Sequence, residues 1–599
     1  MAEKIVSPGV FTQENDLSFV PQGVAEIGAA IIGPTVKGPA GIPIKVSSFS
    51  EYATTFGTTF TSGSNQYEYL TSLAAEQYLA NSGALTVVRI LSGSTVAGAT
   101  SKADIQDNGS FIPTSESANK GTNASMSFAI KTIGDGAVMN STQSAGVAIG
   151  TGGLLSNGTP NNLKWEITTV DRNAGTFTLL IRRGNDTHNS KVILETWNDL
   201  SLDPKSNNYI RKVIGDQYYT TQGAGTSDPF LQLAGDYPRR SKYVYITNNQ
   251  TTVDFIDGNG DADAVATNDL GLYSASLPNV MSGSFAGGND GIPIAAPKFF
   301  DGITDGNVQG FDPDDGGSTY HDALYLLKNQ DIYDINMLMM PGVTQANDSA
   351  TTSLAKTICE ERGDCFLLVD PEKHGQTSLS TVAAKSEQLI SSYAAMYWPW
   401  VKIFASRLGK NVWVPASVVM GGVIAFNDKV AAEWYAPAGL NRGGVSAAIQ
   451  AERGLTHANR DELYLGRINP LATFPGQGVV VWGQKTLQKR PTALDRVNVR
   501  RLLINLKKFI ASTTKYLVFE NNTTATRNRF LGTVNPYMES VQQNQGLYAF
   551  RVIMDESNNT PDVIDRNIMK GEIYIQPAKA AEFIVVDFNI MPTGATFGE

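Results

Sequence analysis

Few positions in this chain of 599 residues combine side chains that could carry out catalysis. The sequence contains no glycine-rich dinucleotide loop, Walker A loop, serine-hydrolase elbow or zinc-protease helix motif. His321 and Asp322 are neighbours, but no nucleophile accompanies them, and an aspartate that opens a predicted helix favours the helix dipole. We therefore expect that the protein is not an enzyme.

One stretch, DGNGDAD, begins like a calcium-binding loop, with oxygen ligands at Asp257, Asn259 and Asp261. Ala262 then stands where the loop needs glycine for its sharp turn, and Asn268 stands where it needs a bidentate glutamate. We expect a solvated loop there and no bound metal ion.

The two cysteines, Cys359 and Cys365, lie where a predicted helix ends and a buried strand begins. The scattered histidines build no zinc site with them: His188, His321, His374 and His457. We expect two free thiols in the core, a reducing compartment and no cofactor. The Arg362-Gly363-Asp364 triplet between the cysteines is interpreted as the end of the helix and not as a cell-adhesion motif.

A strongly basic stretch stands out in a chain whose net charge is −10. It sums to +7 once Asp495 is included, and its basic residues are Lys485, Lys489, Arg490, Arg496, Arg500, Arg501, Lys507 and Lys508. A helix from Asp495 to about Thr513 is predicted there, and its apolar face leaves the basic residues mostly on the remaining surface. That surface is either a solvated polar face or a docking surface for an acidic partner protein. Binding to a phosphate backbone is the weaker alternative, because no aromatic residues are interleaved.

The composition is that of a large globular protein, with 42% hydrophobic and 17% charged residues. At roughly 100 to 200 residues per domain, the length predicts three or four domains. No run of 18 or more apolar residues could span a bilayer, and the N-terminus lacks the apolar core of a signal peptide. We expect a protein made in a cytoplasm, and the negative net charge disfavours a dedicated nucleic-acid-binding protein.

Alternating strands and helices predict a doubly wound α/β core in two parts, residues 22–97 and 298–482. The first part has the strand VAEIGAAIIGP, a helix from Glu68 to Gly83 and the strand ALTVVRIL, which indicates a parallel βαβ unit. In the second part, helices are predicted at 318–331, 349–363 and 379–397, and strands at 335–342, 365–370, 401–404 and 412–417.

Between these parts, residues 98–297 are rich in Ser, Thr, Asn, Gly and Asp, with short alternating segments. Alternating apolar positions at 165–169 and 177–181, separated by the turn signal RNAG, predict a hairpin. We interpret residues 98–297 as a β-rich outer domain inserted into the α/β core.

After the α/β core, a C-terminal α+β domain is predicted at 483–580. Two terminal arms are predicted at 1–21 and 581–599. Beyond the basic helix, the C-terminal domain is expected to contain strands near LYAFRVIM and GEIYIQP. The last arm begins with AEFIVVDFNIM, whose alternating apolar residues read as a strand with no later element to cover it. Such an edge is a template for pairing with another chain.

Nine stretches, in order from Ser7 nearly to the end, resemble those of the contractile tail sheath proteins of myovirus-type bacteriophages. They are SPGVFTQEND, GVAEIGAAIIGPTVKGP, ETWNDLSLDPKSNNYI, ERGDCFLLVDP, SSYAAMYWPWVKI, APAGLNRGGV, INPLATFPGQGVVVWGQKTL, RVNVRRLLINLKKFI and IYIQPAKAAEFIVVDF. The segment from about Thr100 to Leu163 has no such likeness, which fits a phage-specific outer insertion.

The resemblance implies a structural subunit that polymerises as stacked hexameric rings around a tail tube. Contraction, triggered by the baseplate, would drive the tube through the host envelope for genome delivery, without a nucleotide site. Its implied partners are copies of itself, the tail tube protein, and the baseplate and tail terminator proteins, with no direct nucleic-acid binding and no membrane insertion. Its implied location is the tail of a virion assembled in the host cytoplasm. A phage-derived injection device or bacteriocin is the alternative, and an α/β enzyme is less favoured.

By the same resemblance, the two arms of neighbouring copies add strands to a small sheet in the domain nearest the tube. This assigns inter-subunit strand exchange to Val10, Phe11, Leu17, Phe19, Phe583, Ile584, Val585, Val586, Phe588 and Ile590. The candidate tube-facing residues are Lys489, Arg490, Arg496, Arg500, Arg501, Lys507, Lys508, Arg566 and Lys570.

Overall fold

The described part of the chain forms two compact units in the computed structural model. It comprises residues 28–62, 65–91, 100–106, 111–112, 126–142, 151–247, 277–278, 280–289, 317–376 and 378–582. The smaller unit is residues 505–576, and the larger unit contains the described residues of 28–504 together with 577–582. The predicted calcium-like loop, the N-terminal arm and the C-terminal arm beyond residue 582 lie outside the described residues.

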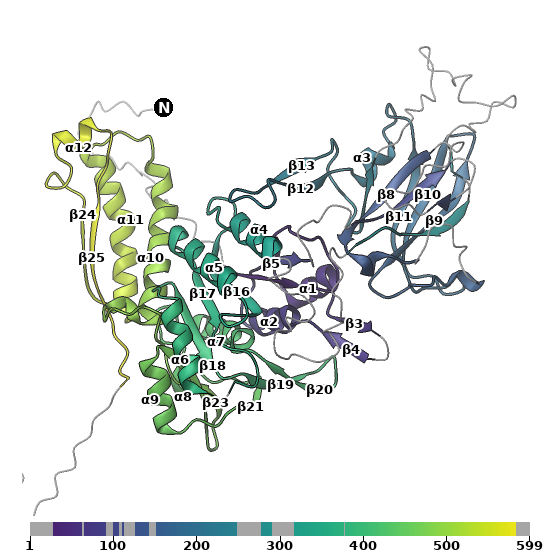
Figure 1. The fold of residues 1–599 in the computed structure, drawn as a ribbon. Coiled ribbons are helices and arrows are strands. Elements are labelled where there is room, and N and C mark those ends of the chain that lie inside the picture. The colour runs from purple at the N-terminus through teal and green to yellow at the C-terminus, as the bar shows by residue number, and fades with distance from the viewer. Residues whose placement is uncertain are drawn as a thin grey trace, which may run out of the picture. The chain divides into compact units, whose positions relative to one another are not determined.

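An eight-stranded sheet is the centre of the larger unit (Figure 1). In sheet order, its strands are β2 (Ile44–Val46), β5 (Leu85–Ile90), β1 (Gly28–Pro34), β16 (Ile335–Thr344), β17 (Phe366–Asp370), β18 (Ala394–Trp398), β22 (Ile468–Phe474) and β23 (Gly478–Val481). Neighbouring strands from β5 to β22 are parallel, whereas β2 and β23 pair antiparallel at the two edges. The predicted parallel pairing of the first two long strands is confirmed.

Helices cover both faces of this sheet, and alternate residues of one strand serve the two sides. In β1, Ala29 and Ile31 belong to one buried cluster, while Ala30 and Ile32 belong to another. Buried residues of α1 (Phe49–Phe56), α2 (Leu70–Leu79) and α7 (Ala416–Val430) complete the first cluster. The second is completed by α4 (Gly317–Leu327), α5 (Ser349–Arg362), α6 (Leu379–Gln388) and α9 (His457–Leu465). The predicted mixed α/β organisation is therefore confirmed.

Two predictions within the core were wrong in detail. The helix expected over 379–397 ends at Gln388, and the apolar run that follows is the fully buried strand β18. A continuous apolar run fits a buried strand as well as a helix, so periodicity alone could not separate them. The strands predicted at 401–404 and 412–417 do not join the central sheet. They lie in a separate three-stranded sheet, in which β19 (Val401–Ala405) pairs with β20 (Lys410–Val414) on one side and β21 (Ala448–Ala451) on the other.

The stretch from Cys359 to Cys365 forms the end of α5 and the turn into the next strand. Cys359 and Cys365 are buried free thiols, as predicted. Gly363 has a φ of 68° and ends α5 in the left-handed conformation that suits glycine. The buried guanidinium of Arg362 donates hydrogen bonds to the carbonyls of Leu327 and Tyr333, which joins the end of α5 to the segment after α4.

Residues 100–289 are rich in β-strands, as expected for the interval 98–297. One four-stranded sheet contains β14 (Val244–Thr247), β8 (Met126–Asp135), β6 (Thr100–Gln106) and β7 (Phe111–Ile112). The other contains β11 (Ile193–Ser201), β10 (Thr176–Arg183), β9 (Leu163–Asp171) and β15 (Met281–Ser284). The predicted hairpin is β9 and β10, with Trp165 opposite Ile181. Smaller elements are the hairpins β3 (Thr59–Ser62) with β4 (Asn65–Glu68) and β12 (Tyr218–Gln222) with β13 (Phe230–Ala234), and the helices α3 (Ile210–Ile214) and α8 (Gly439–Arg442).

The smaller unit contains the last part of α10 (Val497–Thr514), then α11 (Thr524–Gln543), β24 (Leu547–Ile553), α12 (Pro561–Asp565) and β25 (Glu572–Pro577). Both expected strands are present, and they pair as a two-stranded sheet beside α11 (Figure 1). The sequence did not predict α11, which buries Phe530, Val534, Met538 and Val541 on one face. Residues 483–504, expected in the last domain, group with the larger unit. No helix among the described residues is long and apolar enough to cross a membrane.

A buried carboxyl joins the sheet to its longest covering helix. Asp370 ends β17, and its Oδ1 and Oδ2 accept hydrogen bonds from the backbone N–H and the hydroxyl of Ser417 at 3.0 and 2.5 Å. Ser417 lies in the first turn of α7, so Asp370 satisfies a backbone donor at the start of that helix. Burial raises the pKa of Asp370 to about 7, although the two bonds from Ser417 oppose the rise.

This raised pKa predicts a stability that falls with rising pH. The stabilisation is complete below the unfolded pKa of about 4 and is lost as the pH rises through about 7, a change on the order of 2–4 kcal/mol. Asp370→Asn resembles the protonated carboxyl and should therefore flatten the decline in the free energy of unfolding, measured by denaturant titration between pH 5 and 8. Asp461→Asn, at an exposed carboxylate, is the matched control. Equal slopes for wild type and Asp370→Asn would contradict the assignment.

Candidate assembly site at the base of the C-terminal arm

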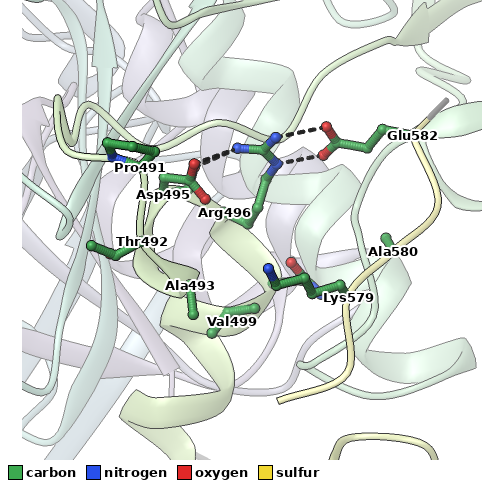
Figure 2. A pocket seen from close by; sticks show the side chains of 10 residues that line it. Pro491, Thr492, Ala493, Asp495, Arg496, Val499, Lys579, Ala580 and Glu582 are labelled. Atoms are coloured by element: carbon green, nitrogen blue, oxygen red, sulfur yellow. Dashed lines mark hydrogen bonds and ion pairs between the residues drawn. The ribbon is translucent and has the colours of Figure 1, made fainter. Parts of the chain in front are cut away.

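The last described residues of the chain border a cavity of about 490 Å³ (Figure 2). One wall is the segment that leads into α10, and the other is the segment after β25. The lining residues are Pro491, Thr492, Ala493, Asp495, Arg496, Asn498, Val499, Lys579, Ala580 and Glu582. Because the predicted arm begins at residue 581, this cavity lies at the base of the arm.

Glu582 is held in place by an ion pair and two further hydrogen bonds. Arg496 donates from Nε to Oε1 at 2.6 Å and from Nη2 to Oε2 at 2.9 Å, as Figure 2 shows. The hydroxyl of Tyr464 donates to Oε2, and Gln484 Nε2 donates to Oε1 at 3.1 Å. This bidentate geometry is the strong form of an arginine–carboxylate pair. We call Arg496, Glu582, Tyr464 and Gln484 the arm clamp.

The parts of the clamp come from three separate elements. Tyr464 lies in the last turn of α9, and Gln484 follows β23. Arg496 directly precedes α10, where the backbone N–H of Val497 donates to the carbonyl of Gln484 at 2.8 Å. The clamp therefore ties the base of the arm to the larger unit through side chains fixed on its secondary structure.

The electrostatics of the clamp favour a charged Glu582. Burial alone would raise the pKa of Glu582, but the hydrogen bonds from Arg496 and Tyr464 outweigh it and lower the pKa. Burial and the neighbouring carboxylate raise the pKa of Tyr464, which keeps its hydroxyl a donor. The Nζ of Lys485 lies 3.6 Å from the centre of the Tyr464 ring, a cation–π contact that supports the ring from the other side.

Two family models match consecutive parts of the chain. The phage tail sheath protein central domain matches residues 316–487, and the phage tail sheath C-terminal domain matches residues 489–591. The second match contains the clamp residues Arg496 and Glu582 and most of the predicted C-terminal arm. Residues 316–591 therefore carry the central and C-terminal domains of the phage tail sheath family.

Known tail sheath proteins are similar to part of this chain. The tail sheath protein of Vibrio phage KVP40 is 31% identical over 48% of this chain and 47% of its own length, and that of Enterobacteria phage T4 is 34% identical over 41% and 39%. The chain thus spans about half the length of the curated relatives it matches. A crystal structure of a sheath tail protein from Listeria innocua aligns over 93% of each chain with a TM-score of 0.52 and 10% identity, which supports the fold alone.

The structure corrects the predicted basic surface. Arg500 and Arg501 were expected on the exposed side of α10, but both are buried, at 4% and 5% exposure. Arg501 forms a two-bond ion pair with Asp428, and Arg500 lies over the ring of Tyr393 at 4.0 Å. Their stems pack in the core while their charged groups find partners from elsewhere in the sequence, which a helical projection cannot reveal.

The other candidate tube-facing residues fall into two groups. Arg496 is half-buried in the arm clamp. The remaining residues lie at or near the surface, and they are Lys489, Arg490, Lys507, Lys508, Arg566 and Lys570. Lys489 reaches Glu387 at 3.3 Å, and Arg566 and Lys570 pair with Asp562 and Glu572. Contact with a tube stays a prediction for this second group, and the residues predicted to exchange strands lie outside the described residues.

The sequence pointed to the arm but not to what holds it. Glu582, Tyr464 and Gln484 carry no recognisable motif, and 86 residues separate Glu582 from Arg496. One signal was available, since Glu582 and Asp587 are the only charged residues in the apolar stretch AEFIVVDFNIM. No cluster of His, Cys, Asp and Glu among the described residues could hold a metal ion.

Removal of the clamp arginine should loosen the base of the arm while the unit stays folded. Hydrogen bonds to charged groups contribute about 1.5–3 kcal/mol each. Arg496→Met keeps the apolar stem and should accelerate amide hydrogen exchange at residues 578–582 at least about tenfold. Arg460→Met is the matched control, because it removes an arginine of α9 outside the clamp.

A pH series distinguishes the ion pair from packing. Because the pKa of Glu582 is lowered in the folded chain, its stabilisation is complete above the unfolded value of about 4.3 and is lost as the pH falls through the folded value. In Glu582→Gln, the amides of residues 578–582 should therefore exchange quickly at neutral pH. Under acid, the protection of these amides should become the same in the variant and the wild type. Slow amide exchange at residues 578–582 in both Arg496→Met and Glu582→Gln at pH 7 would refute the clamp.

Proposed function

We propose that the chain is the structural subunit of a contractile tail sheath. In this proposal it polymerises as stacked hexameric rings around a tail tube, in the tail of a virion assembled in the host cytoplasm. Contraction then drives the tube through the host envelope for genome delivery. The observation that carries the proposal is the pair of consecutive sheath domains matched at 316–487 and 489–591.

The arm clamp supports strand exchange between copies. A strand that pairs with a neighbouring subunit transmits load only if its base is fixed to its own subunit. The bidentate pair between Arg496 and Glu582 supplies such a fixed point, immediately before the alternating apolar segment that begins at Phe583. Apolar alternation from Ile584 to Ile590 suits a strand with one face buried against a partner.

The small sheet of the smaller unit is the proposed acceptor. Among the described residues it contains β24 and β25 alone, and a two-stranded sheet is marginally stable by itself. Its inner side rests on α11, where Leu547 and Phe530 are buried. Its outer side carries Tyr548 and Tyr574, which are 66% and 57% exposed. Added strands from neighbouring copies would satisfy its edges and cover these rings.

The wider partners follow from the proposed polymer. Copies of the chain are the principal partner, the tail tube protein lies inside the rings, and baseplate and tail terminator proteins contact the two ends. In a contractile assembly the energy resides in two packings of the same subunits, so no cofactor, nucleotide or nucleic acid is required. A phage-derived contractile injection device or bacteriocin would use the same subunit chemistry, and it remains the alternative.

The first test is assembly of the chain alone. Purified full-length chain at high concentration should form hollow tubes or rings, because each copy would carry both an arm and an acceptor sheet. Negative-stain electron microscopy and sedimentation measure this directly. A monodisperse monomer at every concentration tested would refute the proposal.

The second test is removal of the arm. A chain that ends at Glu582 keeps the clamp but lacks the exchanged strand, so polymers should disappear while the circular dichroism spectrum and unfolding midpoint remain those of a folded α/β protein. The control variant ends at Met591, which removes the residues after the predicted strand and should still polymerise. Polymers of the Glu582-terminated chain would exclude strand exchange by this arm.

A further inference from the structure

The cavity at the base of the arm is bordered by the first turn of α10, a helix of 18 residues. Asn498 and Val499, the second and third residues of this helix, line the cavity. Within the described part of the chain, their backbone N–H groups donate no hydrogen bond. Arg496 directly precedes the helix, and its side chain offers donors only, so it cannot cap these groups. Two donors of α10 therefore stand without an acceptor beside the cavity.

The side chain of Asn498 gives a second, independent sign of a missing partner. Asn498 is 4% exposed, and its Nδ2 donates to the carbonyl of Trp434 at 3.3 Å. The other end of the amide, Oδ1, is buried and accepts no hydrogen bond from any described residue. A buried acceptor without a donor costs free energy. This lining residue thus requires a donor from a bound group, just as the helix requires an acceptor.

The charges around the cavity admit an anion. Two carboxylates line it, but both pair with Arg496, which reaches Asp495 Oδ2 from Nη1 at 2.9 Å and Glu582 Oε1 from Nε at 2.6 Å. On the opposite wall, Lys579 is exposed and forms no ion pair with the described residues (Figure 2). The lining therefore balances two carboxylates with two cations, and the positive end of the helix dipole favours a further negative charge.

The start of α9 shows which kind of group would complete the site. There, Thr456 Oγ1 accepts from the backbone N–H of Asn459, while Asn459 Oδ1 accepts from the backbone N–H of Thr456. One residue thus offers the helix both a side-chain acceptor and a backbone donor. An aspartate or glutamate in an extended segment offers the same two groups, and its negative charge suits a helix start beside Lys579.

We propose that an acidic residue of a second copy of this chain caps α10 in this cavity. Its carboxylate accepts from the N–H groups of Asn498 and Val499 and pairs with Lys579, and its own backbone N–H donates to Asn498 Oδ1. A second copy is the occupant because the arm that starts here is the segment proposed to pass between copies. Each copy also has 57 acidic and 47 basic residues, and so presents more carboxylates than its own cations can pair. This inference rests on the proposed polymer and adds a side-chain contact to it.

Amide hydrogen exchange, resolved to single residues by mass spectrometry, tests the cap at its two donors. The amides of Asn498 and Val499 should exchange quickly in the unassembled chain and about tenfold more slowly in polymers, since a cap contributes about 1 kcal/mol or more. Fast exchange of both amides in polymers would overturn the proposal. Slow exchange already in the unassembled chain would also overturn it, because the same copy would then supply the cap.

A soluble probe separates this inference from the proposed function. N-acetyl-aspartyl amide, added to the unassembled chain, should slow exchange at Asn498 and Val499, whereas N-acetyl-asparaginyl amide should not. Failure of the wild type to polymerise would count against the proposed function, and the probe then decides on the site. Equal exchange with the two probes would overturn the carboxylate assignment.

Substitutions at two exposed positions of the lining distinguish a cap from general burial. Ala580→Glu places a carboxylate in the cavity from the same copy, so it should raise the unfolding midpoint and raise the concentration needed for polymerisation about tenfold. Ala580→Gln has nearly the same size and is the matched control, which should change neither. Lys579→Gln should weaken polymerisation, and Lys579→Arg, which keeps the charge, should not. Equal polymerisation of Ala580→Glu and Ala580→Gln would refute the proposal.

Discussion

Burial of both faces of one parallel sheet is the constraint on which the larger unit depends. Each central strand must supply apolar side chains to two separate cores, as Ala29 and Ala30 do from adjacent positions of β1. The sequence joins β5 to β16 through the inserted domain, yet both strands pair with β1. The insertion is accommodated by polar contacts near that connection, where Asp135 accepts from the backbone N–H of Ala40 at 2.8 Å. Apolar contact is present there as well, since Val138 of the β-rich segment packs against Val36 and Tyr69.

Patterns within a short window predicted most of the elements. The period of the apolar residues predicted the hairpin of β9 and β10, and the helix–glycine–strand order around Gly363 predicted the end of α5. The same patterns failed where burial is complete. All residues of β18 are buried, so that strand shows no alternation, and α7 is buried on nearly every side. Apolar periodicity arises when one face of an element is buried and the other is exposed, and these two elements are buried on nearly all sides.

Charge was the least predictable property, because pairing depends on residues far apart in the sequence. The basic stretch is distributed among unrelated partners, with Arg496 on Glu582 and Arg501 on Asp428, 86 and 73 residues away. Burial alone would lower the pKa of Arg501, but Asp428 outweighs it and raises the pKa, so the cation persists inside the core. Removal of Asp428 would leave the buried charge of Arg501 without its ion-pair partner, which is strongly destabilising. Much of an apparent docking surface is therefore internal structure.

The distribution of interaction types bears on how a polymer could change its packing and remain connected. Backbone hydrogen bonds along an exchanged strand depend little on which side chains face each other, so they tolerate rotation of the joined bodies. Side-chain contacts between packed surfaces depend on position to within about an ångström and are lost or remade as a unit. A clamp at Glu582 that keeps the strand attached, together with side-chain contacts that differ between two packings, would allow subunits to move without dissociation. In this view the arm keeps neighbouring subunits connected, and the surfaces of the folded units determine which packing is lower in free energy.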